Sequence, residues 1–149
     1  MYPWDRQNPE KRIDSDRMLT FFGEVKTMQR VLMKMRILPG GVAEYLRRHA
    51  LLMACGAGGA DEAASEEERA LCRETWQVHR DAGIRNYSIF LDGTALYAYF
   101  EAEDYQKTLA HITKSEAGQK WQAYMNGLLE QREGIPVMEI FDSPIFVME

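Results

Sequence analysis

The 149-residue sequence predicts an α+β domain, because β-type and helical patterns follow one another in the order β, α, β, β, α, β. Three observations carry this prediction. Apolar and polar residues alternate between Thr27 and Ile37, an Asp-Gly pair at 92–93 separates two β-rich runs, and a helical pattern fills most of 104–131. Apolar residues make up 46% of the chain, which favours one compact core over disorder.

The domain is predicted to occupy residues 27–149, preceded by an N-terminal extension over residues 1–26. The extension contains Pro3, Pro9 and many charges and shows little periodicity. The organisation is therefore one domain with an N-terminal addition.

The first strand is predicted to be half-buried and to end at Pro39-Gly40-Gly41. A helix follows, in which four residues recur at helical spacing and define the inner face: Val42, Tyr45, Leu46 and His49. A tyrosine and a histidine four positions apart on such a face are first of all a packing stripe. The spacing alone leaves open whether this pair serves packing or chemistry.

Residues 51–70 are predicted to be an insertion that leads into a second helix. This stretch is rich in Gly and Ala and then in acidic residues, which favour a solvated helix start over an acid/base pair. Ser65 and Glu68 have the spacing of a capping box, so the helix is expected to begin near Ser65. Gly83 is expected to end it.

The second half of the chain predicts a hairpin turning at Asp92-Gly93, a helical region with a break near Ser115, and a closing β segment interrupted by Pro144. The resulting order matches the split βαβ, or ferredoxin-like, arrangement. Helices then cover only one face of the sheet. We therefore expect a homodimer in which the open faces meet, a dimeric α/β barrel.

Composition excludes several classes of function. The formal net charge of −5 provides no basic field for nucleic acid or an anionic membrane. No apolar run reaches the roughly 18 to 20 residues of a membrane span, and the polar N-terminus does not resemble a signal peptide, so a cytoplasmic location is expected. Cys55 and Cys72 are expected to be free thiols. His79 and His111 have no partners at metal-ligand spacing, so no metal site and no role is assigned to them.

The sequence resembles the L-rhamnose mutarotases, a family of small ferredoxin-like proteins that form dimers. The resemblance lies in four segments: EYLRRHA (44–50), NYSIFLD (86–92), GQKWQAYM (118–125) and VMEIFDSPIF (137–146). They occur in the family's order and span most of residues 30–147. The resemblance implies a cofactor-independent isomerase that interconverts the α and β anomers of L-rhamnose or a related 6-deoxyhexose.

The resemblance also implies roles for five residues. His49 matches the family's proposed proton donor, and Tyr45 matches the tyrosine four residues before it. Tyr87 matches a sugar-contacting tyrosine. The family's tryptophan pair falls on Trp121 and Gln122, so glutamine replaces the second tryptophan. After the histidine, the family continues with Asn-Pro and a Trp-Pro-Glu-Leu run, whereas this chain has HALLMACGAGG.

The chemistry of anomer exchange suits these side chains. The ring oxygen must gain a proton while the anomeric hydroxyl loses one, and an imidazole can exchange protons near neutral pH. A tryptophan offers an apolar face for a sugar and one N–H donor, and a glutamine offers donors and an acceptor. Two alternatives stay open. The segment after His49 differs from the family, which permits a sugar-binding regulator without turnover. An aromatic-rich pocket would also accommodate a cofactor-free enzyme acting on an aromatic substrate.

Overall fold

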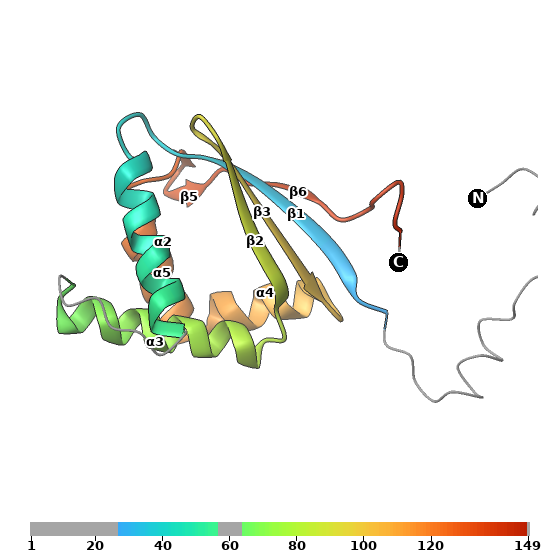
Figure 1. Cartoon of the computed structure of the whole chain (residues 1–149), viewed down its shortest axis with the longest axis horizontal. Helices are drawn as coiled ribbons and strands as arrows, with labels where there is room; N and C mark the ends of the chain where they lie inside the picture. The colour runs from blue at the N-terminus through green and yellow to red at the C-terminus, as the bar shows by residue number, and fades with distance from the viewer. Residues whose placement is uncertain (1–26, 57–63, 149) are drawn as a thin grey trace, which may run out of the picture.

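The computed structural model describes residues 27–56 and 64–148, so the predicted N-terminal extension lies outside the described residues. Within them, helices pack on one side of an antiparallel sheet (Figure 1). The sheet contains β1 (Gln29–Arg36), β2 (Arg85–Asp92), β3 (Ala95–Ala102) and β6 (Glu139–Phe141). The helices are α2 (Val42–Gly56), α3 (Glu66–Asp81), α4 (Tyr105–Lys114) and α5 (Glu116–Asn126). A short hairpin of β4 (Gln131–Arg132) and β5 (Ile135–Pro136) precedes β6.

The strand order β2-β3-β1-β6 is that of the split βαβ unit, with β3 between β1 and β2. Every neighbouring pair is antiparallel. Met33 lies opposite Ala98 on one side and Ile140 on the other, which fixes the register around β1. The predicted α+β, ferredoxin-like fold is confirmed.

Several predicted boundaries are confirmed by the local geometry. The Ser65 hydroxyl accepts a hydrogen bond from the Glu68 amide at 3.1 Å and caps α3. Gly83 follows α3 with φ of +84°, and Gly93 turns the β2-β3 hairpin with φ of +60°. Ser115 both ends α4 and caps α5.

The end of the first helix differs from the prediction. Residues 51–56 belong to α2, and residues 66–70 belong to α3, so helix replaces much of the predicted insertion; residues 57–63 lie outside the described part. The helix continues because Leu51 and Leu52 are buried against Cys72 of α3. Gly56 lies so close to α3 that a Cβ there would come within 2.1 Å of the Trp76 ring.

Two smaller predictions were wrong. Leu46 was expected on the inner face of α2 but is 48% exposed, because the buried stripe runs through Tyr45 and Leu52. The closing β segment pairs with β1 only over β6. The chain beyond it, which contains Pro144, forms no strand in the described residues.

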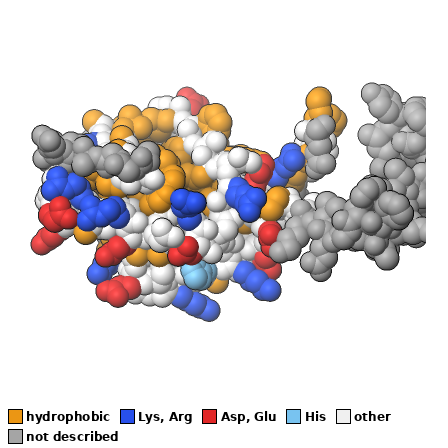
Figure 2. Space-filling model, turned by 60° about the horizontal axis from the view of Figure 1, so that its bottom comes forward, with side chains coloured by type: hydrophobic (Ala, Val, Ile, Leu, Met, Phe, Trp, Pro, Cys, Tyr) orange, Lys and Arg blue, Asp and Glu red, His pale blue; other side chains and the backbone are white. Residues whose placement is uncertain are grey.

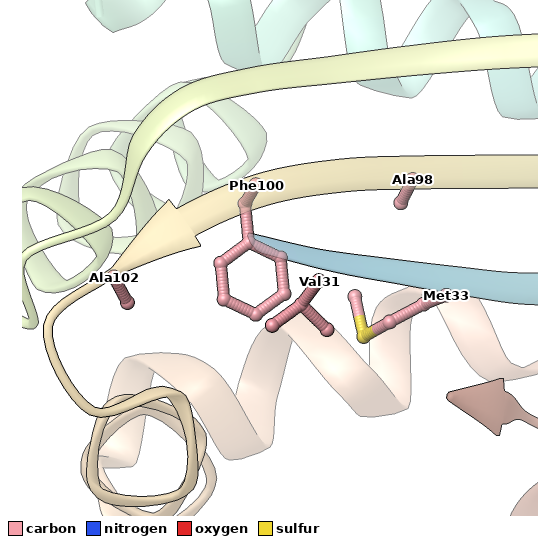
Figure 3. Close-up of a cluster of buried hydrophobic side chains, with 5 residues drawn as sticks. All are labelled: Val31, Met33, Ala98, Phe100 and Ala102. Carbon is pink, nitrogen blue, oxygen red and sulfur yellow. The ribbon is translucent and has the colours of Figure 1, made fainter. Parts of the chain in front are cut away.

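The core lies between the sheet and the helices. Figure 3 shows its part beneath the centre of the sheet, formed by Val31, Met33, Ala98, Phe100 and Ala102. A second buried cluster joins Ile37, Tyr45, Leu96, Met125 and Leu129, and a third joins Leu51, Leu52, Ala64 and Cys72. Trp121 packs against both of these clusters. The candidate site described below lies at this junction.

Among the described residues, no helix covers the other face of the sheet (Figure 1). Large side chains alternate onto it, among them Leu32 and its cross-strand neighbours Tyr99 and Phe141. Phe141 is 51% exposed and Phe90 is 62% exposed. On the side turned forward in Figure 2, by contrast, basic and acidic side chains are interspersed. None of the helices in the described ranges combines the length and hydrophobicity needed to cross a membrane.

Candidate active site

His49 lies on α2, one turn after Tyr45, and faces the interior between the helices and β2. The Tyr45 side chain belongs to the core and is 3% exposed. Its ring stacks on the imidazole with a centroid distance of 5.3 Å and an interplanar angle of 17°. The pair that the sequence singled out is therefore in contact, and Tyr45 fixes one side of the imidazole.

Two more predicted residues complete an aromatic surround of His49. Tyr87 of β2 lies nearly parallel to the imidazole at 6.2 Å, and Trp121 of α5 meets it edge-on, also at 6.2 Å. Tyr87 lies in a β-bulge, where it and Asn86 together oppose the single Phe100. Four of the five residues implied by the resemblance are thus brought together.

Gln122 is not part of this arrangement. It is exposed on α5 and is not among the residues that line the pocket beside His49. Neighbouring positions of a helix point about 100° apart, so Trp121 and Gln122 cannot both face the same interior. In this chain Trp121 takes the inner position.

The polar atoms of His49 are buried and have no hydrogen-bond partner among the described residues. This holds for both Nδ1 and Nε2. Burial, with a smaller contribution from the nearby His79, lowers the pKa of His49 to about 4. Burial also raises the pKa of Tyr87 to about 12 and that of Tyr45 further, so both phenols stay protonated at neutral pH. The surround is electrically neutral, and its imidazole has free capacity for hydrogen bonds.

A pocket of about 210 Å³ opens beside His49, between α2, α3, β2 and α5. Ten residues line it: His49, Leu52, Met53, Trp76, His79, Arg80, Ile84, Asn86, Tyr87 and Trp121. The indole nitrogen of Trp76 is also buried without a partner among the described residues. Buried unpaired polar atoms are costly, so their concentration at one pocket indicates a polar ligand.

Trp76 and His79 were not predicted as site residues. A signal for them exists in the sequence, because Cys72, Thr75, Trp76 and His79 recur at the spacing of one helical face. Cys72 and Thr75 are completely buried, which confirms that this face of α3 points inward. What the sequence did not show is that this face meets α2 at His49.

Larger hollows also occur. One of about 350 Å³ is lined by Tyr45 and His49 together with Ile89 and Leu91. Another, of about 420 Å³, borders α4 away from His49 and contains His111, together with the charged residues Asp81, Glu103 and Lys107. It has no aromatic lining. No group of three or more His, Cys, Asp or Glu side chains with metal-binding geometry occurs in the described ranges. The pocket at His49 is therefore the better candidate site, although it is not the largest.

A charged cluster lies beside the pocket and ties its walls together. Arg47 donates hydrogen bonds to Glu44 at 2.8 Å and to Glu68 of α3 at 2.9 Å. The Tyr124 hydroxyl of α5 donates to Glu68 at 2.5 Å. The Arg48 guanidinium donates a hydrogen bond to the Tyr124 carbonyl oxygen and lies over the Tyr124 ring. This cluster joins the three helices that carry His49, His79 and Trp121.

The fold and the site together define a small ferredoxin-like protein with a histidine-centred aromatic pocket, suited to proton exchange with a small polar ligand. Sequence comparison gives the family. The family model described as L-rhamnose mutarotase matches residues 66–143, which include Tyr87 and Trp121. A curated L-rhamnose mutarotase of Listeria monocytogenes serovar 1/2a is 36% identical over 105 residues, covering 69% of this chain and 82% of that protein. The chain belongs to the L-rhamnose mutarotase family.

Two further matches are shorter or more distant. The L-rhamnose mutarotase of Ligilactobacillus salivarius is 44% identical over 54 residues, covering 34% of this chain and 48% of that protein. Among solved structures, Rv0793 from Mycobacterium tuberculosis gives a TM-score of 0.48 at 14% identity, covering 83% of this chain and 100% of that one. The family assignment rests on the sequence matches.

Proposed function

We propose that this protein is an L-rhamnose mutarotase, which interconverts the α and β anomers of the sugar by acid/base catalysis at His49. One observation carries the proposal: within the described part of the chain, His49 presents two buried ring nitrogens without partners at a pocket whose walls include Tyr87 and Trp121. A sugar ring offers both hydrogen-bond donors and acceptors, so its hydroxyls satisfy these nitrogens. The L-rhamnose mutarotases of Listeria provide the substrate assignment.

The reaction needs only proton transfers and one bond rotation. The bond between the anomeric carbon and the ring oxygen breaks as the anomeric hydroxyl loses its proton and the ring oxygen gains one. The open-chain aldehyde turns about its first carbon–carbon bond and closes on the other face. Because no electrons leave the sugar, no redox cofactor is required. His49 exchanges the proton, and the phenol of Tyr87 holds a hydroxyl as donor or acceptor.

The pocket suits a monosaccharide in size and polarity. Its volume of about 210 Å³ is below the roughly 300–1,000 Å³ typical of sites for drug-sized ligands. The Trp121 ring offers a surface for the C–H face of the sugar, and the Trp76 N–H, which has no partner among residues 27–56 and 64–148, offers a donor. With a net charge of −5, the chain favours a neutral sugar over a phosphorylated one. We place this activity in the cytoplasm.

The test is magnetisation transfer by NMR between the two anomeric protons of L-rhamnose. The wild type is expected to exchange them faster than buffer, and His49→Gln is expected to lower the catalysed rate by roughly 10²- to 10⁴-fold. His111→Gln is a matched control, because His111 is exposed and lies at the other hollow. Exchange at the buffer rate in the wild type, with L-rhamnose still bound, would identify a sugar-binding regulator instead.

We also propose that the protein works as a homodimer joined through the open sheet face. Phe90 on β2 and Phe141 on β6 lie at the two edges of that face and are 62% and 51% exposed, with Leu32 and Tyr99 on the strands between them, so apolar side chains extend across the face. Sedimentation should give twice the chain mass of 17.2 kDa for the wild type. Phe141→Lys should shift it toward the monomer, whereas a monomeric wild type at micromolar concentration contradicts the proposal.

A further inference from the structure

We propose that His79 is a second proton-transfer residue of the site, whose Nε2 accepts the anomeric proton while His49 supplies a proton to the ring oxygen. This inference rests on the proposed function and adds a catalytic residue to it. No motif that links the chain to its family contains His79. The proposal rests on three features of the described residues: a fixed tautomer, a shared pocket, and a shared aromatic neighbour.

The tautomer of His79 is fixed by its own helix. Its Nδ1 lies 2.8 Å from the carbonyl oxygen of Thr75, one turn earlier on α3. A carbonyl oxygen can only accept, so Nδ1 carries the proton. In the neutral ring Nε2 then carries a lone pair. Burial lowers the pKa of His79, which keeps the ring neutral near pH 7 and leaves Nε2 able to accept a proton.

The two histidines meet at one pocket from different helices. His49 reaches it from α2 and His79 from α3, and Tyr87 is a ring neighbour of both, at 6.2 and 6.4 Å. Burial of each imidazole and their mutual repulsion favour states in which the pair holds at most one extra proton. Arg80 also lines the pocket and adds to the cost of a second positive charge.

One shared proton is sufficient for a balanced cycle. The cycle runs through the form in which His49 carries the proton and His79 is neutral, a minority form at pH 7 because the pKa of His49 is about 4. In that form His79 removes the anomeric proton as the ring bond breaks, and His49 protonates the ring oxygen. The pair then holds the same charge, with the proton moved from His49 to His79. After rotation, His79 returns its proton to the aldehyde oxygen and the new ring hydroxyl returns its proton to His49. A single imidazole would have to reach both sugar oxygens in turn.

The decisive experiment compares anomer exchange in the wild type, His79→Asn and His111→Asn. Asparagine keeps an N–H able to donate to the Thr75 carbonyl but removes Nε2. We expect His79→Asn to lose at least about 30-fold in exchange rate while its dissociation constant for L-rhamnose, measured by titration calorimetry, changes less than about threefold. His111→Asn should match the wild type. The retained binding separates proton transfer from a packing defect, and His79→Gln provides a second variant if the asparagine chain fails to fold.

A double variant sharpens the result. Because the two residues act on one proton, His49→Gln with His79→Asn should be little slower than the slower single variant. An exchange rate in folded, sugar-binding His79→Asn within threefold of the wild type overturns the role of His79 and leaves the proposed function intact. Absence of exchange in the wild type overturns both.

Discussion

The polar side chains on the two sides of α2 differ in whether they are hydrogen-bonded. On one side Arg47 and Arg48 are engaged by Glu44, Glu68 and the Tyr124 carbonyl. On the other side, both ring nitrogens of the next residue, His49, are buried, and neither is hydrogen-bonded among the described residues. The first side therefore holds the helices in place, and the second keeps an unsatisfied group for a ligand.

Within one turn of α2, Arg47 and Arg48 therefore serve stability, whereas His49 serves ligand binding. A satisfied ion-pair cluster contributes to stability and sets the distances between α2, α3 and α5. An unpaired buried imidazole costs stability and is tolerated where binding restores its hydrogen bonds. The four predictions below change one side at a time, ordered by expected effect.

Mild acid should lower the free energy of unfolding, mainly through protonation of His49. The pKa of His49 is lowered from 6.5 to about 4, so the unfolded chain takes up a proton in this range that the folded chain resists. Stability is then fully present above pH 6.5 and falls as the pH drops toward 4, by at most about 3 kcal/mol for this residue. His79 acts in the same direction. Denaturant unfolding at a series of pH values measures the loss.

The charged side provides the contrast for this measurement. The hydrogen bonds from Arg47 and Arg48 lower the pKa of Glu44 to about 2, so that carboxylate keeps its charge through the same range. Between pH 6.5 and 5, above the ordinary glutamate pKa of 4.5, the slope should therefore become shallower in His49→Leu and stay unchanged in Glu44→Gln. An equal slope in His49→Leu and the wild type contradicts the assignment of this transition to His49.

Replacing His49 with leucine should stabilise the protein while abolishing anomer exchange. The change removes two buried unpaired nitrogens, each worth roughly 1 kcal/mol or more, and keeps an apolar side chain of similar size. We expect a gain of about 1–2 kcal/mol at pH 7, read as a higher melting temperature. A clear loss of stability would show that His49 is a packing residue whose shape the core requires.

Much of the scaffold could be predicted from local patterns. The alternation in β1, the Gly93 turn and the Ser65 and Ser115 caps depend on neighbouring residues only, so the sequence shows them directly. The family motifs contain Tyr45, Tyr87 and Trp121, and the structure brings their rings together around His49.

The remainder depends on contacts between distant segments. α2 continues to Gly56 because Leu51 and Leu52 pack against Cys72 of α3. No pattern within residues 51–56 reveals this contact. His79 enters the pocket for the same reason, since only the crossing of α3 over α2 brings its face to His49. Gln122 shows that a motif match can also mislead. It aligns with a site residue of the family, but in this structure it is exposed on α5.

On the charged side, Tyr124→Phe should cost about 1 kcal/mol. The substitution removes the 2.5 Å hydrogen bond to Glu68, whose side chain is 25% exposed, and keeps the ring under Arg48. Because this bond joins α5 to α3, a small rise in the Michaelis constant should accompany the loss. Tyr105→Phe, which removes an exposed hydrogen bond to Asp142, is the matched control and should change the melting temperature less.

Glu44→Gln should have the smallest effect, although the pKa of Glu44 is lowered to about 2. The carboxylate accepts from Arg47 and Arg48 at 2.8 Å, but its side chain is 37% exposed, and water and salt screen such pairs. Arg47 also retains Glu68 as a partner. We expect a loss below about 0.5 kcal/mol at low salt that disappears at high salt. A loss above about 1.5 kcal/mol that persists at high salt would mean that Glu44 is needed to aim both arginines, and that the charged side, like the histidine side, depends on a single residue.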